Sequence, residues 1–232
     1  YASREAQEIL RRPGALKTIR RLSGEASEAA GLSWNSEYDD RELQVDVGLE
    51  DGETVVIGDH RVYAFATVGH TRCSMSYIVD DEVMLCSETV GVLGPGDAYM
   101  PSFLVDYLGA EESIRRSSQF SVRTIILNHY GPVDEADRNG IWDILLKKLK
   151  DSREAMISIM ERFPDDDEAL REMERVFHSR VDKKDQPDEA FYINAASMMK
   201  TLRRQFPECF VRGYQLIAAV DRNWAIGNQG RM

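Results

Sequence analysis

The sequence predicts an α+β protein in which a sheet of short strands is followed by a helical segment. Between residues 42 and 128, short apolar runs alternate with turn-type sequences such as 50–53 and 80–82, a pattern typical of strands in a sheet. From 134 to 206, apolar residues instead recur at the helical period of about 3.6 residues. With 232 residues, 43% of them hydrophobic, the chain is long enough for one large domain or two small ones.

Each predicted element follows from a local pattern. At helical spacing recur Met100, Phe103, Leu104, Tyr107 and Leu108, and we expect this stripe to belong to the core rather than to a substrate site. Small and charged residues predict helices over 3–12 and 14–30, ahead of the strands. The apolar runs predict strands at 42–47, 54–57, 61–67, 75–79, 83–86 and 123–128.

The helical region is divided by proline and by acidic residues. Phe163-Pro164 ends the first long helix, and the aspartates at 165–167 suit the start of the next, where the helix dipole favours acids. His178 lies among Arg and Val in this second helix, so we expect it on the surface. Residues 183–187 are predicted as a linker and 189–206 as a last helix.

Three potential metal ligands each close a predicted strand. His70, Glu88 and His129 follow the apolar runs AFATVG, VMLCS and RTIILN, and turn-type residues come after each of them. Ligand-binding side chains commonly collect where strands end and loops begin. Two imidazoles and a carboxylate suit zinc or iron, but their long separation requires assembly by the fold. The competing interpretation is that these side chains are solvated or bonded to the backbone.

The sequence around these residues resembles the metallo-β-lactamase superfamily. The segment GHTRCSMSYIVDDEVMLCSETVG, residues 69–91, is similar to that family's Gly-His-Thr-x-x-Ser segment and the hairpin that ends in a metal-bridging acid. LNHYGPVD, residues 127–134, is similar to its last histidine motif. The resemblance covers residues 1–135. It implies an αββα-type metallo-β-lactamase fold and a dinuclear site of two zinc ions, or of iron, held in part by His70, Glu88 and His129.

The chain departs from the family in three ways. The family's His-x-His-x-Asp-His string is not among its four histidines, so we expect a fragment that holds only the second half of the fold and is inactive as it stands. Glu88 stands where the family usually has Asp, and Arg72-Cys73 where Pro-Gly is frequent. Cys73 and Cys86 are therefore near the site in sequence, and Cys86 is either a thiolate ligand or a small buried hydrophobe.

Composition limits the partners and the compartment. The net charge of −11 disfavours nucleic acid, whose phosphates would be repelled. No apolar run is long enough for a membrane span. Three cysteines without a pairing pattern predict a reducing, cytoplasmic location. We expect a small-molecule substrate, and the oligomeric state stays open.

The end of the chain carries a second resemblance. YQLIAAVDRNWAIGNQGRM, residues 214–232, is similar to the opening strand and loop of dihydrofolate reductases. The resemblance implies that Ala218, Ile226 and Gly227 contact cofactor or folate, with NADPH as cofactor if the reductase domain is present. A true fusion and a gene-prediction artefact would give the same sequence.

These observations predict three segments and leave three functions. Residues 1–133 form a partial metallo-β-lactamase-like domain, 134–207 a helical extension, and 208–232 a linker with a truncated reductase-like strand and loop. The leading function is a metal-dependent hydrolase in which metal-activated water attacks a substrate of unidentified class. The alternatives are an NADPH-dependent dihydrofolate reductase and a non-catalytic scaffold or binding protein with the same fold.

Overall fold

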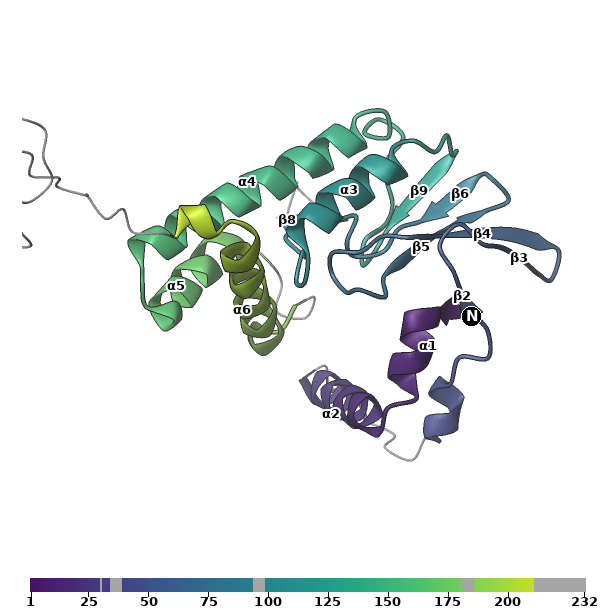
Figure 1. Cartoon of the computed structure of the whole chain (residues 1–232), viewed down its shortest axis with the longest axis horizontal. Coiled ribbons are helices and arrows are strands. Elements are labelled where there is room, and N and C mark those ends of the chain that lie inside the picture. The colour runs from purple at the N-terminus through teal and green to yellow at the C-terminus, as the bar shows by residue number, and fades with distance from the viewer. Residues whose placement is uncertain (30, 34–38, 94–98, 180, 182–185, 211–232) are drawn as a thin grey trace, which may run out of the picture.

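A computed structural model describes residues 1–210 apart from 30, 34–38, 94–98, 180 and 182–185. Its centre is a mixed six-stranded sheet in the order β10-β9-β6-β5-β4-β3 (Figure 1). The strands of this sheet are β3 (Thr54–Ile57), β4 (His60–Ala66), β5 (Met75–Val79), β6 (Val83–Leu85), β9 (Thr124–Leu127) and β10 (Gly131–Pro132). The predicted α+β class is confirmed.

The direction of the strands brings three strand ends to one rim of the sheet. β4 and β5 are antiparallel, β5 and β6 are antiparallel, and β6 and β9 are parallel. It follows that β4, β6 and β9 all run the same way, and the chain leaves all three at the same rim. The parallel pair requires a crossover, which residues 86–123 provide. The sequence places His70, Glu88 and His129 just beyond these three ends.

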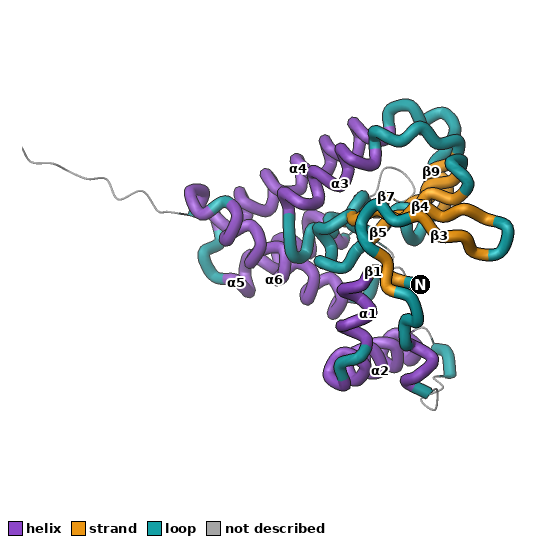
Figure 2. The backbone as a smooth tube through the Cα atoms, turned by 45° about the vertical axis from the view of Figure 1, so that its right-hand side comes forward, coloured by secondary structure: helices purple, strands orange, loops and turns teal. Residues whose placement is uncertain are grey.

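One face of the sheet packs against helices. Cross-strand neighbours Tyr63, Ile78, Met84 and Ile125 form a row on this face. The helices α3 (Tyr107–Ser117) and α4 (Ile141–Arg162) cover it, and α5 (Asp166–Met173) and α6 (Asp188–Gln205) extend the layer beyond the sheet (Figures 1 and 2).

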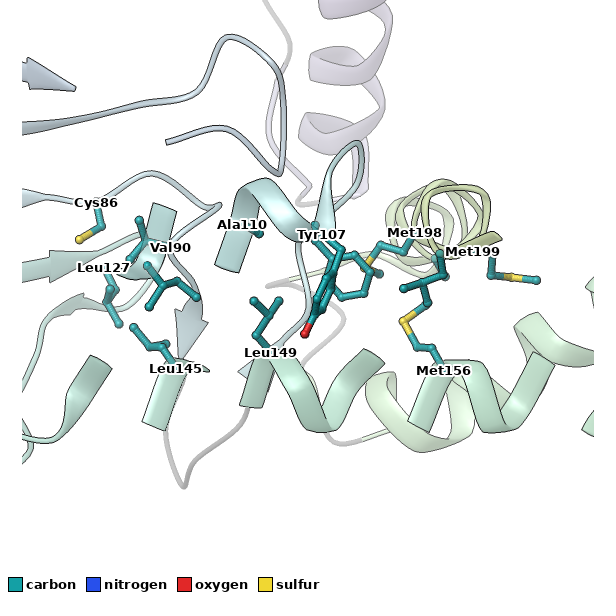
Figure 3. Close-up of a cluster of buried hydrophobic side chains, with 14 of the residues drawn as sticks. Cys86, Val90, Tyr107, Ala110, Leu127, Leu145, Leu149, Met156, Met198 and Met199 are labelled. Atoms are coloured by element: carbon teal, nitrogen blue, oxygen red, sulfur yellow. The ribbon is translucent and has the colours of Figure 1, made fainter. Parts of the chain in front are cut away.

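A single apolar core joins the sheet to this helical layer. It runs from Phe65 in β4 through Ile114 in α3 and Leu145 in α4 to Leu202 in α6, all of them fully buried. Figure 3 shows its methionine-rich end, where Met156 lies close to Met198 and Met199. Because side chains of the sheet and of all four helices share this core, the region that carries the strand ends is packed rigidly from one side.

The N-terminal elements lie on the other side of the sheet from α3 and α4 (Figure 1). Here Leu49 packs with Ala64 and Met75 in a smaller core. The elements are β1 (Ala2–Ser3), α1 (Arg4–Leu10), α2 (Pro13–Ala29) and β2 (Gly48–Leu49), which pairs in parallel with β1. Among the described residues, no helix combines the length and apolar character that crossing a membrane requires.

The predicted strand at 42–47 is wrong. This stretch begins in a short 3-10 helix, η1 (Asp40–Leu43), and continues without regular structure to β2. The cause is local, because the Asp39 side chain accepts a hydrogen bond from the Arg41 N–H at 2.9 Å and caps this turn. Such side-chain bonds to the backbone compete with strand pairing.

The predicted stripe is only partly buried, and most of it is not helical. Met100, Phe103 and Tyr107 lie in the core, whereas Leu104 is half-buried and Leu108 is 52% exposed. Met100 pairs within the two-stranded sheet of β7 (Val92–Leu93) and β8 (Tyr99–Met100). Pro101 then interrupts the chain, and α3 begins only at Tyr107, where Asp106 caps it by accepting from the Gly109 N–H at 2.9 Å. The helical spacing of Met100, Phe103 and Tyr107 therefore reflects burial of one side of an irregular segment, and not a continuous helix.

His178 is buried, with 3% of its surface exposed, and the prediction that it lies on the surface is wrong. It ends a π-helical turn, η3 (Glu174–His178), that directly follows α5. In an α-helix, the residues three or four positions after the buried Met173 would face the core. The wider π-helical turn instead brings the residue five positions later, His178, to the core. Val176, which the α-helical period favours for burial, is 42% exposed.

Candidate metal centre

The three predicted ligands meet at the sheet rim, around a single carboxylate. Nε2 of His70 lies 2.7 Å from Oε2 of Glu88, and Nε2 of His129 lies 2.6 Å from Oε1. Each oxygen of Glu88 therefore faces one imidazole. The His70 and Glu88 side chains are 20% and 30% exposed, while that of His129 is 45% exposed. The cluster is thus closed on the His70 side and open to solvent beside His129.

Hydrogen bonds fix the orientation of His70. Its N–H in the backbone donates to the Thr89 hydroxyl at 2.9 Å. Its Nδ1 lies 3.2 Å from the carbonyl oxygen of Ser102, which can only accept, so the proton sits on Nδ1. In the neutral ring, Nε2 then carries the lone pair and points at Glu88. Metal-ligating histidines typically donate their second ring nitrogen to such a carbonyl.

The backbone of Glu88 is held from two sides. Ser102 donates its hydroxyl hydrogen to the Glu88 carbonyl at 2.5 Å. With its amide nitrogen toward the Cys86 carbonyl, Asn128 donates to that oxygen at 3.0 Å and accepts from the Glu88 N–H at 2.9 Å. Asn128 directly precedes His129, so it couples the loop after β6 to the loop after β9.

Glu88 is strongly acidic in this position. Its hydrogen bond to His70 is the largest cause that lowers the pKa of the Glu88 carboxyl, to about 2, and the contact with His129 adds to it against the opposing effect of burial. The carboxylate is consequently ionised throughout the neutral range. An ionised carboxylate can only accept, so each Nε2 that faces it must carry a hydrogen, or a bound metal must stand between the two atoms.

His129 adopts a backbone conformation that is uncommon for residues with a side chain. Its φ is +71°, in the left-handed region. This conformation turns the chain sharply between β9 and the two-residue strand β10, and it directs the imidazole back toward Glu88. Strained positions of this kind concentrate at functional sites.

The donor set suits a first-row metal, although the predicted ligand atoms contact one another directly. Imidazole nitrogens and a carboxylate are standard ligands for zinc and iron. The two contacts have the length of hydrogen bonds, and within the described residues no group of three His, Cys, Asp or Glu side chains is spaced to hold an ion as it stands. Residues 70, 88 and 129 therefore suit a metal in donor chemistry, but their side chains would have to move apart to admit an ion.

Cys86 behaves as a core residue. It is 4% exposed, and burial raises the pKa of its thiol to about 12. Its side chain lies among apolar residues that include Val90 and Leu127 (Figure 3). The buried-hydrophobe interpretation is thus the correct one for Cys86. Cys73 contacts the Thr71 hydroxyl at 3.3 Å.

Two residues of this site were not singled out from the sequence, namely Ser102 and Asn128. Ser102 lies far along the chain in an irregular segment, and no periodic pattern marks it. Asn128 could have been noticed, because it is a polar residue at the very end of a buried strand. Ala218, Ile226 and Gly227, the predicted cofactor contacts of a reductase, lie outside the described residues, and none of the comparisons below supports that resemblance.

Comparison with known proteins gives similarity in structure but not in sequence. No protein-family model and no characterised protein sequence matches this chain. A metallo-β-lactamase family protein from Thermus thermophilus is similar in structure, with a TM-score of 0.52 and 15% identity over 88% of this chain and 66% of that protein. An archaeal metallo-β-lactamase superfamily protein from Sulfolobus tokodaii has a TM-score of 0.47 and 20% identity over 65% of this chain and 56% of that one.

This chain thus spans 56% and 66% of the lengths of the two solved proteins. At these levels of identity the likeness concerns the fold alone. We conclude that this chain has a fold similar to that of metallo-β-lactamase family proteins.

Proposed function

We propose that this chain is part of a metal-dependent hydrolase of the metallo-β-lactamase superfamily. In this proposal His70, Glu88 and His129 supply part of a dinuclear zinc or iron site, and the substrate is a small molecule. The observation that carries it is the shared carboxylate, whose two oxygens each face one imidazole Nε2. A carboxylate in this arrangement is suited to bridge two cations.

A metal pair in such a site would supply a bound water that ionises near neutral pH and would polarise the substrate. The chain's own residues prepare for this. Ser102 holds His70 in the tautomer that leaves the Nε2 lone pair for a metal. The low pKa of Glu88 keeps protons off its oxygens at neutral pH. The exposed side of His129 leaves a path from solvent.

The first test is zinc binding by the full chain, measured by calorimetry and by elemental analysis after dialysis. We expect weak binding, because the family's first histidine cluster is not in this sequence. Replacing Glu88→Gln or His70→Ala should weaken zinc binding by about 100-fold or more, since a ligand is lost. His60→Ala is the matched control, because His60 contacts Asp80 at 2.6 Å in an exposed pair away from the rim.

Zinc binding that is equal in the wild type and in all three variants would reject the site. No binding by the wild type would favour the scaffold alternative. The hydrolase part has its own test, in which the zinc-loaded chain is assayed with a lactam, a thioester and a phosphodiester. Slow turnover that disappears in Glu88→Gln would support it. Zinc binding without turnover of any of these is the result expected of a chain without the first histidine cluster, and it would support the metal site alone.

A further inference from the structure

The segment 102–106, here called the support segment, forms hydrogen bonds with His70 and Glu88 of the candidate metal centre. The Ser102 carbonyl accepts from His70, and the Ser102 hydroxyl donates to the Glu88 carbonyl. Further along, the N–H groups of Val105 and Asp106 both donate to the carbonyl of Gly69, at 2.9 and 3.1 Å. The support segment is therefore bonded both to the loop that carries His70 and to the loop that carries Glu88.

The opposite side of the support segment is held by α6. Gln205 accepts from the Tyr107 N–H at 2.7 Å, and its amide nitrogen donates to Asp106 Oδ1 at 2.6 Å. Thr201, which is 3% exposed, donates to the Leu104 carbonyl at 2.7 Å. Arg204 donates to the Val105 carbonyl. These bonds join residues 97 to 99 positions apart in the sequence.

Irregular backbone must find partners for its polar groups outside a helix or sheet ladder. Three carbonyls of the support segment accept hydrogen bonds from side chains. The Ser102 carbonyl accepts from His70, the Leu104 carbonyl from Thr201, and the Val105 carbonyl from Arg204. The position of the segment is consequently determined by α6 on one side and by the metal-centre loops on the other. If a contact with α6 is lost, the support segment can shift, and the hydrogen bond between the Ser102 carbonyl and the His70 imidazole should weaken.

We infer that α6 positions the candidate metal centre through the support segment, and that Gln205 is one of its positioning residues. Gln205 does not touch any of the three predicted ligands. It fixes the junction of the support segment with α3, and the segment in turn presents the Ser102 carbonyl to His70. The inference deepens the proposed function and rests on it for its effect on metal binding, but its effect on His70 is independent of metal.

The test compares Gln205→Ala with Arg203→Ala in the metal-free full chain. Arg203 is the matched control, because it is a neighbour on α6 that pairs with Asp166 of α5. The readout is the His70 Nδ1 proton, observed by NMR in protein with labelled histidine, with His70→Gln giving the assignment among four histidines. We expect Gln205→Ala, which loses two hydrogen bonds, to speed its exchange about fivefold, and Arg203→Ala to leave it unchanged.

A conservative variant separates positioning from general stability. Asp106→Asn removes the charge at the start of α3 but keeps the oxygen that accepts from Gln205 and from the Gly109 N–H, so exchange should stay near the wild-type rate. Unchanged exchange in Gln205→Ala, even with a lower thermal midpoint, would overturn the inference. Zinc titration of the same proteins should show about a fivefold loss for Gln205→Ala alone. If no variant binds zinc but exchange responds, the metal proposal fails and the positioning inference stands.

Discussion

Two histidine–carboxylate contacts in this molecule look alike in distance but differ in their surroundings. At the sheet rim, Glu88 receives His70 and His129 at 2.7 and 2.6 Å. Between the helices, Nε2 of His178 lies 3.0 Å from Asp188. The rim cluster shares one carboxylate between two rings, and the second nitrogen of His70 is bonded to a carbonyl. The helical contact has one ring, whose Nδ1 is buried without a partner among the described residues.

The difference indicates that the two histidine–carboxylate contacts have different roles. The His178 ring stacks on Phe191, with 4.7 Å between ring centres and 13° between planes, and its side chain is 2% exposed. It acts mainly as an aromatic core residue that joins the π-turn to α6. The rim cluster is partly exposed and concentrates ligand atoms. Distance alone would not separate a packing histidine from a ligand. The bonding of the second ring nitrogen and the sharing of the carboxylate are what distinguish His178 from the proposed ligand His70.

The largest expected effect comes from the packing histidine. His178→Ala removes a buried stacked ring, and we expect a loss of about 3 kcal/mol in the free energy of unfolding. His70→Ala removes a partly exposed ring and should cost about 1 kcal/mol or less, while abolishing the proposed metal site. Urea unfolding measures both. His178→Phe, which keeps the ring, should recover most of the loss. Equal costs for the two alanine variants would contradict the assignment of purposes.

Acid should weaken the rim cluster next. The folded-state pKa of Glu88 is about 2, below the ordinary 4.5, so its contribution to stability is complete above about pH 4.5 and is lost as the pH falls toward 2. Since the side chain is 30% exposed, solvent screening limits this contribution to about 2 kcal/mol. The measurement is urea unfolding of the wild type and Glu88→Gln at about pH 5.5, where the contribution is complete, and at about pH 2.5, where most of it is lost. The difference between the two proteins should shrink at the lower pH, and a constant difference would argue against the low pKa.

A third comparison separates the backbone at His129 from its ring. His129→Val and His129→Asn both remove the imidazole, so both should lose zinc binding. Only valine is incompatible with a φ of +71°, and it should cost about 1 to 2 kcal/mol more than asparagine in urea unfolding. If the two variants are equally stable, the loop relaxes to an ordinary conformation and the strain is not maintained by the fold.

The smallest effect is expected at His60, whose side chain is 66% exposed in its contact with Asp80. An exposed pair of this kind contributes about 0.5 kcal/mol at most. His60→Ala should therefore leave the urea midpoint almost unchanged, and added salt should not alter the comparison. A loss as large as that of His178→Ala would show that exposure is a poor guide to purpose among the histidines of this chain.

The sequence was sufficient for the features that rest on local patterns. Strand ends at His70, Glu88 and His129 follow from apolar runs, and the direction of the strands brings them to one rim. Features that depend on contacts between distant residues could not be predicted. His178 was misplaced because a π-turn shifts the buried face by one residue. Ser102 was missed because its two bonds reach loops that only the folded chain brings near it.

The parallel pairing of β6 with β9 also has a consequence for the order of folding. The hairpins from β3 to β6 join neighbours along the chain and can form early, whereas the β6–β9 pair must first close the crossover of residues 86–123. Glu88 and His129 meet only after that closure. The proposed metal site can therefore assemble only after this crossover has closed, at one of the last steps of folding.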